Sequence, residues 1–179
     1  MGISQGMRRG VPRVLAAAAL AALLGACASP ATIQPGETQA ATMARLGKPV
    51  AELPLPNGGT RLIYTSQPMG QYTWITDYDT NHVAVSTVQA LTSTRFEMIN
   101  NGLEEGKWNR DRMLFEFGPP AEIRRVAFPA DQAVWGYRFR QDGVWNSLMY
   151  VYVRDSDGVV TRFHPGPDPL ADPREGFGR

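Results

Sequence analysis

The chain has 179 residues, of which 43% are hydrophobic and 9% aromatic, and its formal net charge is +1. Three of its 18 Lys and Arg residues lie within residues 1–26, a stretch without Asp or Glu, so acidic side chains are in slight excess in the remainder. Because nucleic-acid-binding domains are typically basic, we expect no nucleic-acid partner. The apolar content is sufficient for the core of one ordinary domain or two small ones.

Residues 1–26 have the pattern of a secretory signal. Arg8, Arg9 and Arg13 precede an almost wholly apolar run, Val14–Ala26. This run is shorter than the ~20 apolar residues of a membrane-spanning helix. A basic start, a short apolar middle and small residues at the end are typical of a cleavable signal. We therefore expect the protein to be exported.

Cys27 is the single cysteine of the chain and follows this signal directly. A lone cysteine in an exported chain cannot form an internal disulfide and calls for another explanation. The sequence LGAC at residues 24–27 resembles the lipobox of bacterial lipoproteins, which implies lipid attachment to the Cys27 thiol and acylation of its new amine. Two or more acyl chains give stable membrane anchoring, and Ala28, in place of the usual inner-membrane retention signal Asp, favours the outer membrane. The alternative is an ordinary signal peptide with an unrelated cysteine.

The two ends of the mature chain are poor in residues that build a core. Residues 27–34 are mostly small and predict a tether, and residues 165–179 (PGPDPLADPREGFGR) are rich in Pro and Gly. Such compositions cannot bury enough apolar surface to fold. We expect the segment from 165 to 179 to be a disordered tail.

Two similar segments predict two similar helices. The segments are TQAATMARLGKP (residues 38–49) and NRDRMLFEFGPP (residues 109–120). Each begins with a good N-cap residue. Each ends in a glycine, Gly47 or Gly118, followed two positions later by a proline, which is typical of a helix C-terminus. This repetition predicts an internal duplication.

Strand-like runs follow each of these helices, separated by turn sequences such as PADQ, RQDG and DSDG. In the first copy they are residues 61–67, 71–77 and 82–91, and in the second they are residues 122–128, 133–139, 147–153 and 159–163. Residues 92–102 predict a further short helix. A helix followed by an antiparallel meander, twice over, predicts an α+β protein.

The motifs in this order resemble those of the BamE (SmpA/OmlA) lipoprotein family. The shared features are Ile-x-x-Gly, a capped helix ending LGKP or FGPP, the strand AVWGYRFRQDG and the hairpin YVYVRDSDGVV. The resemblance implies two tandem BamE-like repeats, a divergent first one at residues 33–91 and a second at residues 92–164. Each is expected to have a short helix or helix pair and a three-stranded antiparallel meander, a fold related to the β-lactamase-inhibitor proteins.

The same resemblance implies a periplasm-facing outer-membrane lipoprotein that acts as a protein-binding scaffold in envelope or outer-membrane protein assembly. Its partners would be the outer membrane, through the acyl chains, and envelope-assembly proteins. One alternative is an inhibitor- or sensor-like periplasmic module that binds one protein target through its sheet. The other is a hydrolytic or metal-dependent enzyme.

The residues argue against the enzyme. The thiol is consumed by lipid, His82 and His164 are far apart in the sequence, and the usual serine-nucleophile motifs are missing from it. The stretch DYDTN at residues 77–81 begins like a calcium loop, but the Gly and Glu that such a loop requires are His82 and Val88. We expect Asx-type turns there, and no catalytic residue, metal or cofactor.

Three residues of the second repeat are candidates for partner or anionic-lipid binding: Trp135, Tyr150 and Arg140. Strand aromatics that do not face the core are typical of binding surfaces. Phe139 is expected in the core, which leaves Arg140 near the rim of the strand, where a guanidinium can bind a phosphate or carboxylate through two hydrogen bonds. The alternative is a solvated arginine beside Asp142.

Overall fold

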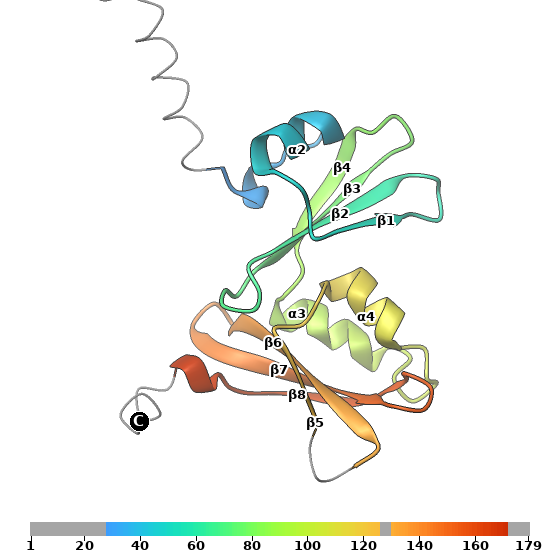
Figure 1. The fold of residues 1–179 in the computed structure, drawn as a ribbon, viewed down its shortest axis with the longest axis vertical. Helices are drawn as coiled ribbons and strands as arrows, with labels where there is room; N and C mark the ends of the chain where they lie inside the picture. Colours follow the sequence, from blue (N-terminus) through green and yellow to red (C-terminus); the bar gives the residue numbers. More distant parts are fainter. Residues whose placement is uncertain (1–27, 126–129, 172–179) are drawn as a thin grey trace, which may run out of the picture.

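The computed structural model describes residues 28–125 and 130–171, and these form two four-stranded antiparallel sheets with short helices (Figure 1). The first sheet contains, in order, β1 (Ala51–Pro54), β2 (Thr60–Thr65), β3 (Thr73–Tyr78) and β4 (Ala84–Gln89). The second contains β5 (Glu122–Arg125), β6 (Gln132–Gln141), β7 (Trp145–Arg154) and β8 (Val160–Pro167). The helical segments are η2 (Pro30–Thr32), α2 (Gln39–Leu46), α3 (Ser93–Phe96), η3 (Glu97–Asn100), α4 (Arg110–Phe117) and η4 (Pro169–Ala171). The α+β class is therefore confirmed.

The three-stranded meander implied by the resemblance is wrong, because each sheet has four strands. The four strand-like runs expected in the second copy are confirmed as β5 to β8. The first sheet gains β1, whose residues Ala51 and Pro54 pair with Ile63 and Thr60 of β2. This strand has only four residues and ends in a proline. Proline has no N–H to donate to a neighbouring strand, and an edge strand such as β1 tolerates this because it has a neighbour on one side only. From the sequence alone, so short a strand cannot be distinguished from a loop.

Both predicted helices and their caps are confirmed. The side-chain oxygen of Thr38 accepts a hydrogen bond from the Ala41 N–H at 3.2 Å, and that of Asn109 accepts one from the Arg112 N–H at 2.9 Å. Gly47 and Gly118 end α2 and α4 with φ of 81° and 74°, a left-handed conformation that glycine adopts without steric cost. The segment 92–102 also forms the expected helix, as α3 and η3.

The two halves share details that the duplication predicts. In each, the N-cap residue of the helix forms an isolated β-bridge with the residue directly before the last strand, Thr38 with Val83 and Asn109 with Val159. The sheet register also shifts at matching places, between the third and fourth strands of each sheet. Finally, the glycines of the two Ile-x-x-Gly motifs both have a φ of 93°.

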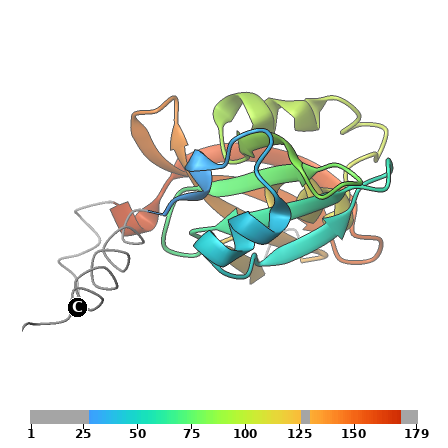
Figure 2. The same cartoon turned by 90° about the horizontal axis from the view of Figure 1, so that it is seen from above.

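The elements stack in four layers: α2, the first sheet, the helices α3 and α4, and the second sheet (Figures 1 and 2). The largest core lies between α3, α4 and the second sheet and includes Phe96, Trp108, Phe117, Tyr137 and Phe139. A smaller core lies between α2 and the first sheet. The helices α3 and α4 thus lie between the two sheets.

The opposite face of the first sheet is covered by the second unit. The Arg61 guanidinium of β2 lies 4.0 Å over the ring of Phe115 and donates a hydrogen bond to the Phe115 carbonyl at 3.0 Å. Gly118, at the end of α4, lies against Ile63 and Thr73. Contacts of this kind join the two repeats into one structure.

The boundary of the predicted tail is wrong. The strand β8 continues to Pro167, and Asp168, which follows it, is 5% exposed. Its carboxylate lies 3.1 Å from the Arg138 guanidinium, and this ion pair holds residues 165–171 in the fold.

Residues 172–179, the predicted signal and Cys27 lie outside the described residues. No helix within the described ranges is both long enough and apolar enough to span a membrane.

Candidate binding surfaces

The structure places Trp135 in the core, and this corrects its predicted place on an exposed binding face. Its side chain is 6% exposed and belongs to the core under α3 and α4, together with Tyr137 and Phe139. Alternate residues of a strand face the same side of a sheet. Trp135 therefore has the same orientation as Tyr137 and Phe139.

Tyr150 lies on the other face of the second sheet, within a group of side chains that we call the aromatic face: Tyr150, Tyr152, Arg162 and His164. The His164 ring centroid lies 5.5 Å from that of Tyr150 and 5.7 Å from that of Tyr152. The Arg162 guanidinium lies 3.7 Å over the Tyr152 ring. Both tyrosines are half-buried, whereas Arg162 and His164 are exposed.

The pairing of β7 with β8 brings these four residues together, because Tyr150 is opposite His164 and Tyr152 is opposite Arg162. A glycine allows the Tyr150 ring to lie flat on the sheet, since a Cβ at Gly166 would approach within 2.8 Å of that ring. The two tyrosines were recognisable in the sequence as aromatic strand residues. Arg162 and His164 were missed as candidates, although the alternation of β8 places them on the same face.

The electrostatic character of the aromatic face is neutral to cationic. Desolvation by burial raises the pKa of the Tyr150 hydroxyl, and the nearby Arg124 lowers it to a smaller extent, so this hydroxyl is protonated at neutral pH. Arg162 supplies positive charge, while Arg124 at the edge lies 2.8 Å from the Glu122 carboxylate. The aromatic face is therefore suited to a partner whose surface is apolar and has acidic groups at its margin.

The aromatic face is the side of the second sheet that corresponds to the covered side of the first. On the first sheet that side packs against α4 through Ile63 and Arg61. Across residues 28–125 and 130–171, no helix lies over this face of β7 and β8 in the same way (Figure 1), and the contacts at Arg138 come from Asp168 and from the turn that contains Gln67 and Pro68. An aromatic sheet face without a covering layer is a candidate protein-binding surface.

Arg140 lies where the sequence predicts, at the exposed end of β6. It lines a cavity of about 490 Å³ between the two units, bounded on one side by Tyr72 and on the other by Ser93 and Asp142. Its guanidinium donates hydrogen bonds to the Asn146 side chain at 3.0 Å and the Gly143 carbonyl at 3.3 Å. These contacts fix the position of the guanidinium beside the turn between β6 and β7. Arg140 is thus well removed from Trp135 in the core.

The turn at residues 77–83 is an Asx-type turn, as predicted. The Asp79 carboxylate accepts hydrogen bonds from the backbone N–H groups of Asn81 at 2.9 Å and Val83 at 3.0 Å. The hydrogen bond from Val83 is the main reason why the pKa of Asp79 lies below its usual value. Within the part of the chain that is described, no group of three or more His, Cys, Asp and Glu side chains could hold a metal ion.

The comparisons with known proteins give no family for this chain. No protein-family model matches it, and neither a curated protein nor a solved structure does so.

Proposed function

We propose that this protein is a periplasm-facing outer-membrane lipoprotein that binds other proteins as a scaffold in envelope or outer-membrane protein assembly. The observation that carries the proposal is the aromatic face. In the first unit, the corresponding surface packs against the short helix α4. A partner that presents a similar helical surface would complete the second unit in the same manner.

The residues of the aromatic face have the chemistry of a protein-binding site. Tyrosine and arginine are the residue types enriched where a few side chains carry most of the binding energy. The tyrosines offer apolar area together with a hydroxyl, and Arg162, which is stacked on Tyr152, presents a cation beside them. A partner with an apolar surface and acidic residues at its margin fits this arrangement, as Phe115 and Glu116 fit Arg61 in the first unit.

The proposed attachment to the membrane rests on the sequence around Cys27. Radiolabelled fatty acid supplied to cells should label the wild-type protein, and the variant Cys27→Ser should carry no label and appear in the soluble fraction or keep its signal. Ala28→Gly is a matched control that should be labelled as the wild type is. Equal labelling of Cys27→Ser would contradict the lipoprotein assignment.

One alternative function uses the same surface. An inhibitor- or sensor-like module would also bind its target through the exposed side of a sheet, and the aromatic face is such a side. The identity of the captured protein separates the two functions. After extraction in mild detergent, co-purification of outer-membrane assembly subunits supports the scaffold, whereas a single soluble enzyme supports the inhibitor.

For Arg140 we propose contact with an anionic group of a partner or a lipid at the cavity between the units. The variant Arg140→Glu should lose this contact with an unchanged circular dichroism spectrum, because the side chain is exposed and its two hydrogen bonds are within one turn. Flotation with anionic vesicles and crosslinking yield measure the loss. Undiminished capture by the folded variant would remove Arg140 from the site.

A further inference from the structure

Exposed apolar side chains gather at one end of the molecule. We call this the tether end; it contains the turns between β2 and β3 and between β6 and β7, together with η2 and η4 (Figures 1 and 2). Its exposed large apolar residues are Val50, Met69, Tyr72, Val144, Trp145 and Leu170. Met69 is 75% exposed and Trp145 is 67% exposed. Single exposed apolar side chains are normal on protein surfaces, whereas a group of them marks an interaction surface. We call this group of six side chains the patch.

Hydrogen bonds show that these turns lie side by side. The Gln71 side chain, from the turn between β2 and β3, donates to the Asn146 side chain at 2.7 Å, and Asn146 immediately follows Trp145. The Asp168 N–H donates to the Asn146 carbonyl at 3.2 Å, which places η4 and Leu170 beside the same turn. The patch is thus shared by both units.

The N-terminal chain reaches the body of the protein at this same end. Ser29 and Pro30 line a cavity of about 320 Å³ together with Val50, Tyr72 and Trp74. Ser29 is only two residues from Cys27. Since each residue spans at most about 3.6 Å, a lipid on Cys27 would attach close to the patch.

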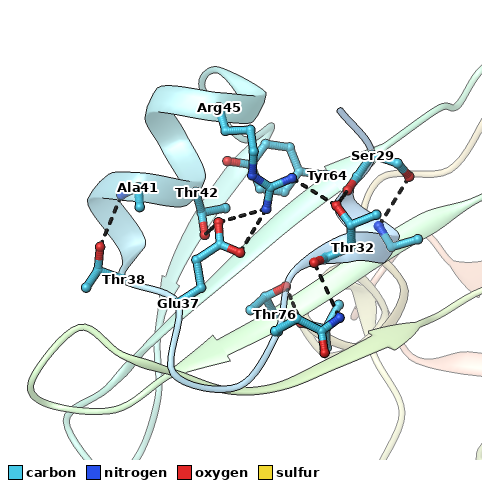
Figure 3. Close-up of polar contacts among 12 residues, drawn as sticks. Ser29, Thr32, Glu37, Thr38, Ala41, Thr42, Arg45, Tyr64 and Thr76 are labelled. Atoms are coloured by element: carbon cyan, nitrogen blue, oxygen red, sulfur yellow. Dashed lines mark hydrogen bonds and ion pairs between the residues drawn. The ribbon is translucent and has the colours of Figure 1, made fainter. Parts of the chain in front are cut away.

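A network of polar contacts fixes the exit of this chain (Figure 3). The Arg45 guanidinium of α2 donates to both carboxylate oxygens of Glu37, at 2.7 and 2.9 Å, and to the Thr32 hydroxyl at 2.9 Å. The Ser29 hydroxyl caps η2 by accepting a hydrogen bond from the Ala31 N–H at 3.3 Å. The direction in which the chain leaves the body is therefore set by the fold.

At the opposite end, the turns that the structure describes are polar. They contain Asn57, Asp79, Asn81, Asp155 and Asp157. At the tether end, the charged side chains that line the two cavities are the cations Lys48 and Arg140 and the acid Asp142, and the buried ion pair of Arg138 with Asp168 lies beside the same turns. Among the described residues, the exposed apolar groups at the tether end suit contact with lipid, and the polar turns at the opposite end suit contact with water.

From these observations we infer that the tether end is a membrane-contacting surface, in which Met69, Tyr72 and Trp145 enter the lipid interface. The inference rests on the lipid anchor of the proposed function. It identifies the part of the protein that the anchor would hold against the membrane. Tyrosine and tryptophan favour the membrane–water interface because their rings are apolar with a polar group at one edge. With the strands directed away from the membrane, the aromatic face remains open to a protein partner.

The test uses the full lipidated protein in phosphatidylcholine vesicles with and without brominated acyl chains. Bromine quenches tryptophan only on contact, and the difference between the wild type and Trp145→Phe isolates the emission of Trp145. We expect Trp145 to be quenched in the brominated vesicles and its emission to shift to the blue. Met69→Asp should reduce the quenching, whereas Val85→Asp, at a similarly exposed valine on β4 near the polar end, should leave it unchanged.

Two results in vesicles would overturn the inference. One is Trp145 emission that is the same in brominated and ordinary vesicles, and the other is equal loss in Met69→Asp and Val85→Asp. A protein partner that protects Trp145 in cells, with no quenching in vesicles, would also reject the membrane as its occupant. If fatty-acid labelling finds Cys27 unmodified, coupling this sole thiol to a maleimide phospholipid gives the same attachment, so failure of the anchor and failure of the contact are distinguishable.

Discussion

The Tyr137 hydroxyl donates a hydrogen bond to the carbonyl of Gly118, the residue that ends α4, at 3.3 Å. The first unit repeats this contact, because the Tyr64 hydroxyl donates to the Gly47 carbonyl at 2.9 Å. In both units a tyrosine of the second strand thus satisfies a carbonyl at the end of the helix, where the backbone has no partner within the helix itself. The pair of contacts is detailed support for the duplication.

Removal of either hydroxyl should destabilise the fold. Tyr137→Phe and Tyr64→Phe each lose one hydrogen bond, at a cost of about 0.5–1.5 kcal/mol. Tyr137 is the more fully buried of the two, so its Gly118 partner has less access to water and we expect the larger loss there. Urea denaturation measures both values. Tyr72→Phe, at an exposed tyrosine, is the control, and an equal change there would contradict the role of the two contacts.

The two helix-ending glycines should respond differently to substitution. A Cβ at Gly118 would lie 3.1 Å from methyl groups of both Ile63 and Thr73, whereas a Cβ at Gly47 meets no atom within 4 Å. Both positions have positive φ, which costs a non-glycine residue about 1 kcal/mol or more. Gly118→Val should therefore lower the free energy of unfolding by more than Gly47→Val does. Equal losses in thermal denaturation would show that the packing of Gly118 against the first unit contributes nothing.

The ion pair between Arg138 and Asp168 predicts that the C-terminal segment stabilises the fold. Both side chains are almost inaccessible, with 7% and 4% of their area exposed, and Arg138 also donates to the Pro68 carbonyl at 2.6 Å. Asp168→Ala leaves a buried guanidinium without its counter-charge, a change that costs about 3–5 kcal/mol in other buried pairs. Glu104→Ala, at an exposed acid, should have little effect. A loss below about 1 kcal/mol for Asp168→Ala would contradict this account.

The contact between Glu37 and Arg45 predicts a dependence of stability on acid pH. Desolvation raises the pKa of Glu37, but hydrogen bonds from Arg45 and Thr42 and the charge of Arg45 together lower it below the ordinary value of 4.5. A carboxyl group whose pKa is lower in the folded state stabilises the fold above its unfolded pKa, and this contribution disappears as the pH falls through the folded value. Glu37→Gln should therefore lose stability at neutral pH and show a flatter decline below pH 4.5. A parallel decline in both proteins would exclude Glu37 as a cause.

Local signals explain what could be predicted from the sequence. The ends of α2 and α4 follow from their cap residues, because capping depends on residues within a few positions of each other. The buried positions of Tyr137 and Phe139 follow from the alternation of a strand. The same alternation, applied along the whole of β6 and β8, also predicts that Trp135 lies in the core and that Arg162 and His164 lie on the face of Tyr150 and Tyr152.

Other features depend on contacts between distant parts of the chain. The pairing of Arg138 with Asp168 joins the middle of a strand to a segment whose composition is typical of a disordered tail. The coverage of the first sheet by α4 depends on Arg61 and Phe115, which lie 54 residues apart. The order of residues in the chain contains no signal for such pairs, so only the folded structure distinguishes the covered sheet face from the aromatic one.

Site-specific photocrosslinking in intact cells tests the central claim, that the aromatic face binds a protein. A photoreactive residue at position 162, on the aromatic face, should give a discrete crosslinked protein, and the same residue at position 86, on the exposed part of β4, should not. Tyr150→Ala combined with the probe at 162 should reduce the yield while the protein stays in the membrane fraction. Equal crosslinking from both positions, or a yield at 162 that Tyr150→Ala does not change, would contradict the account.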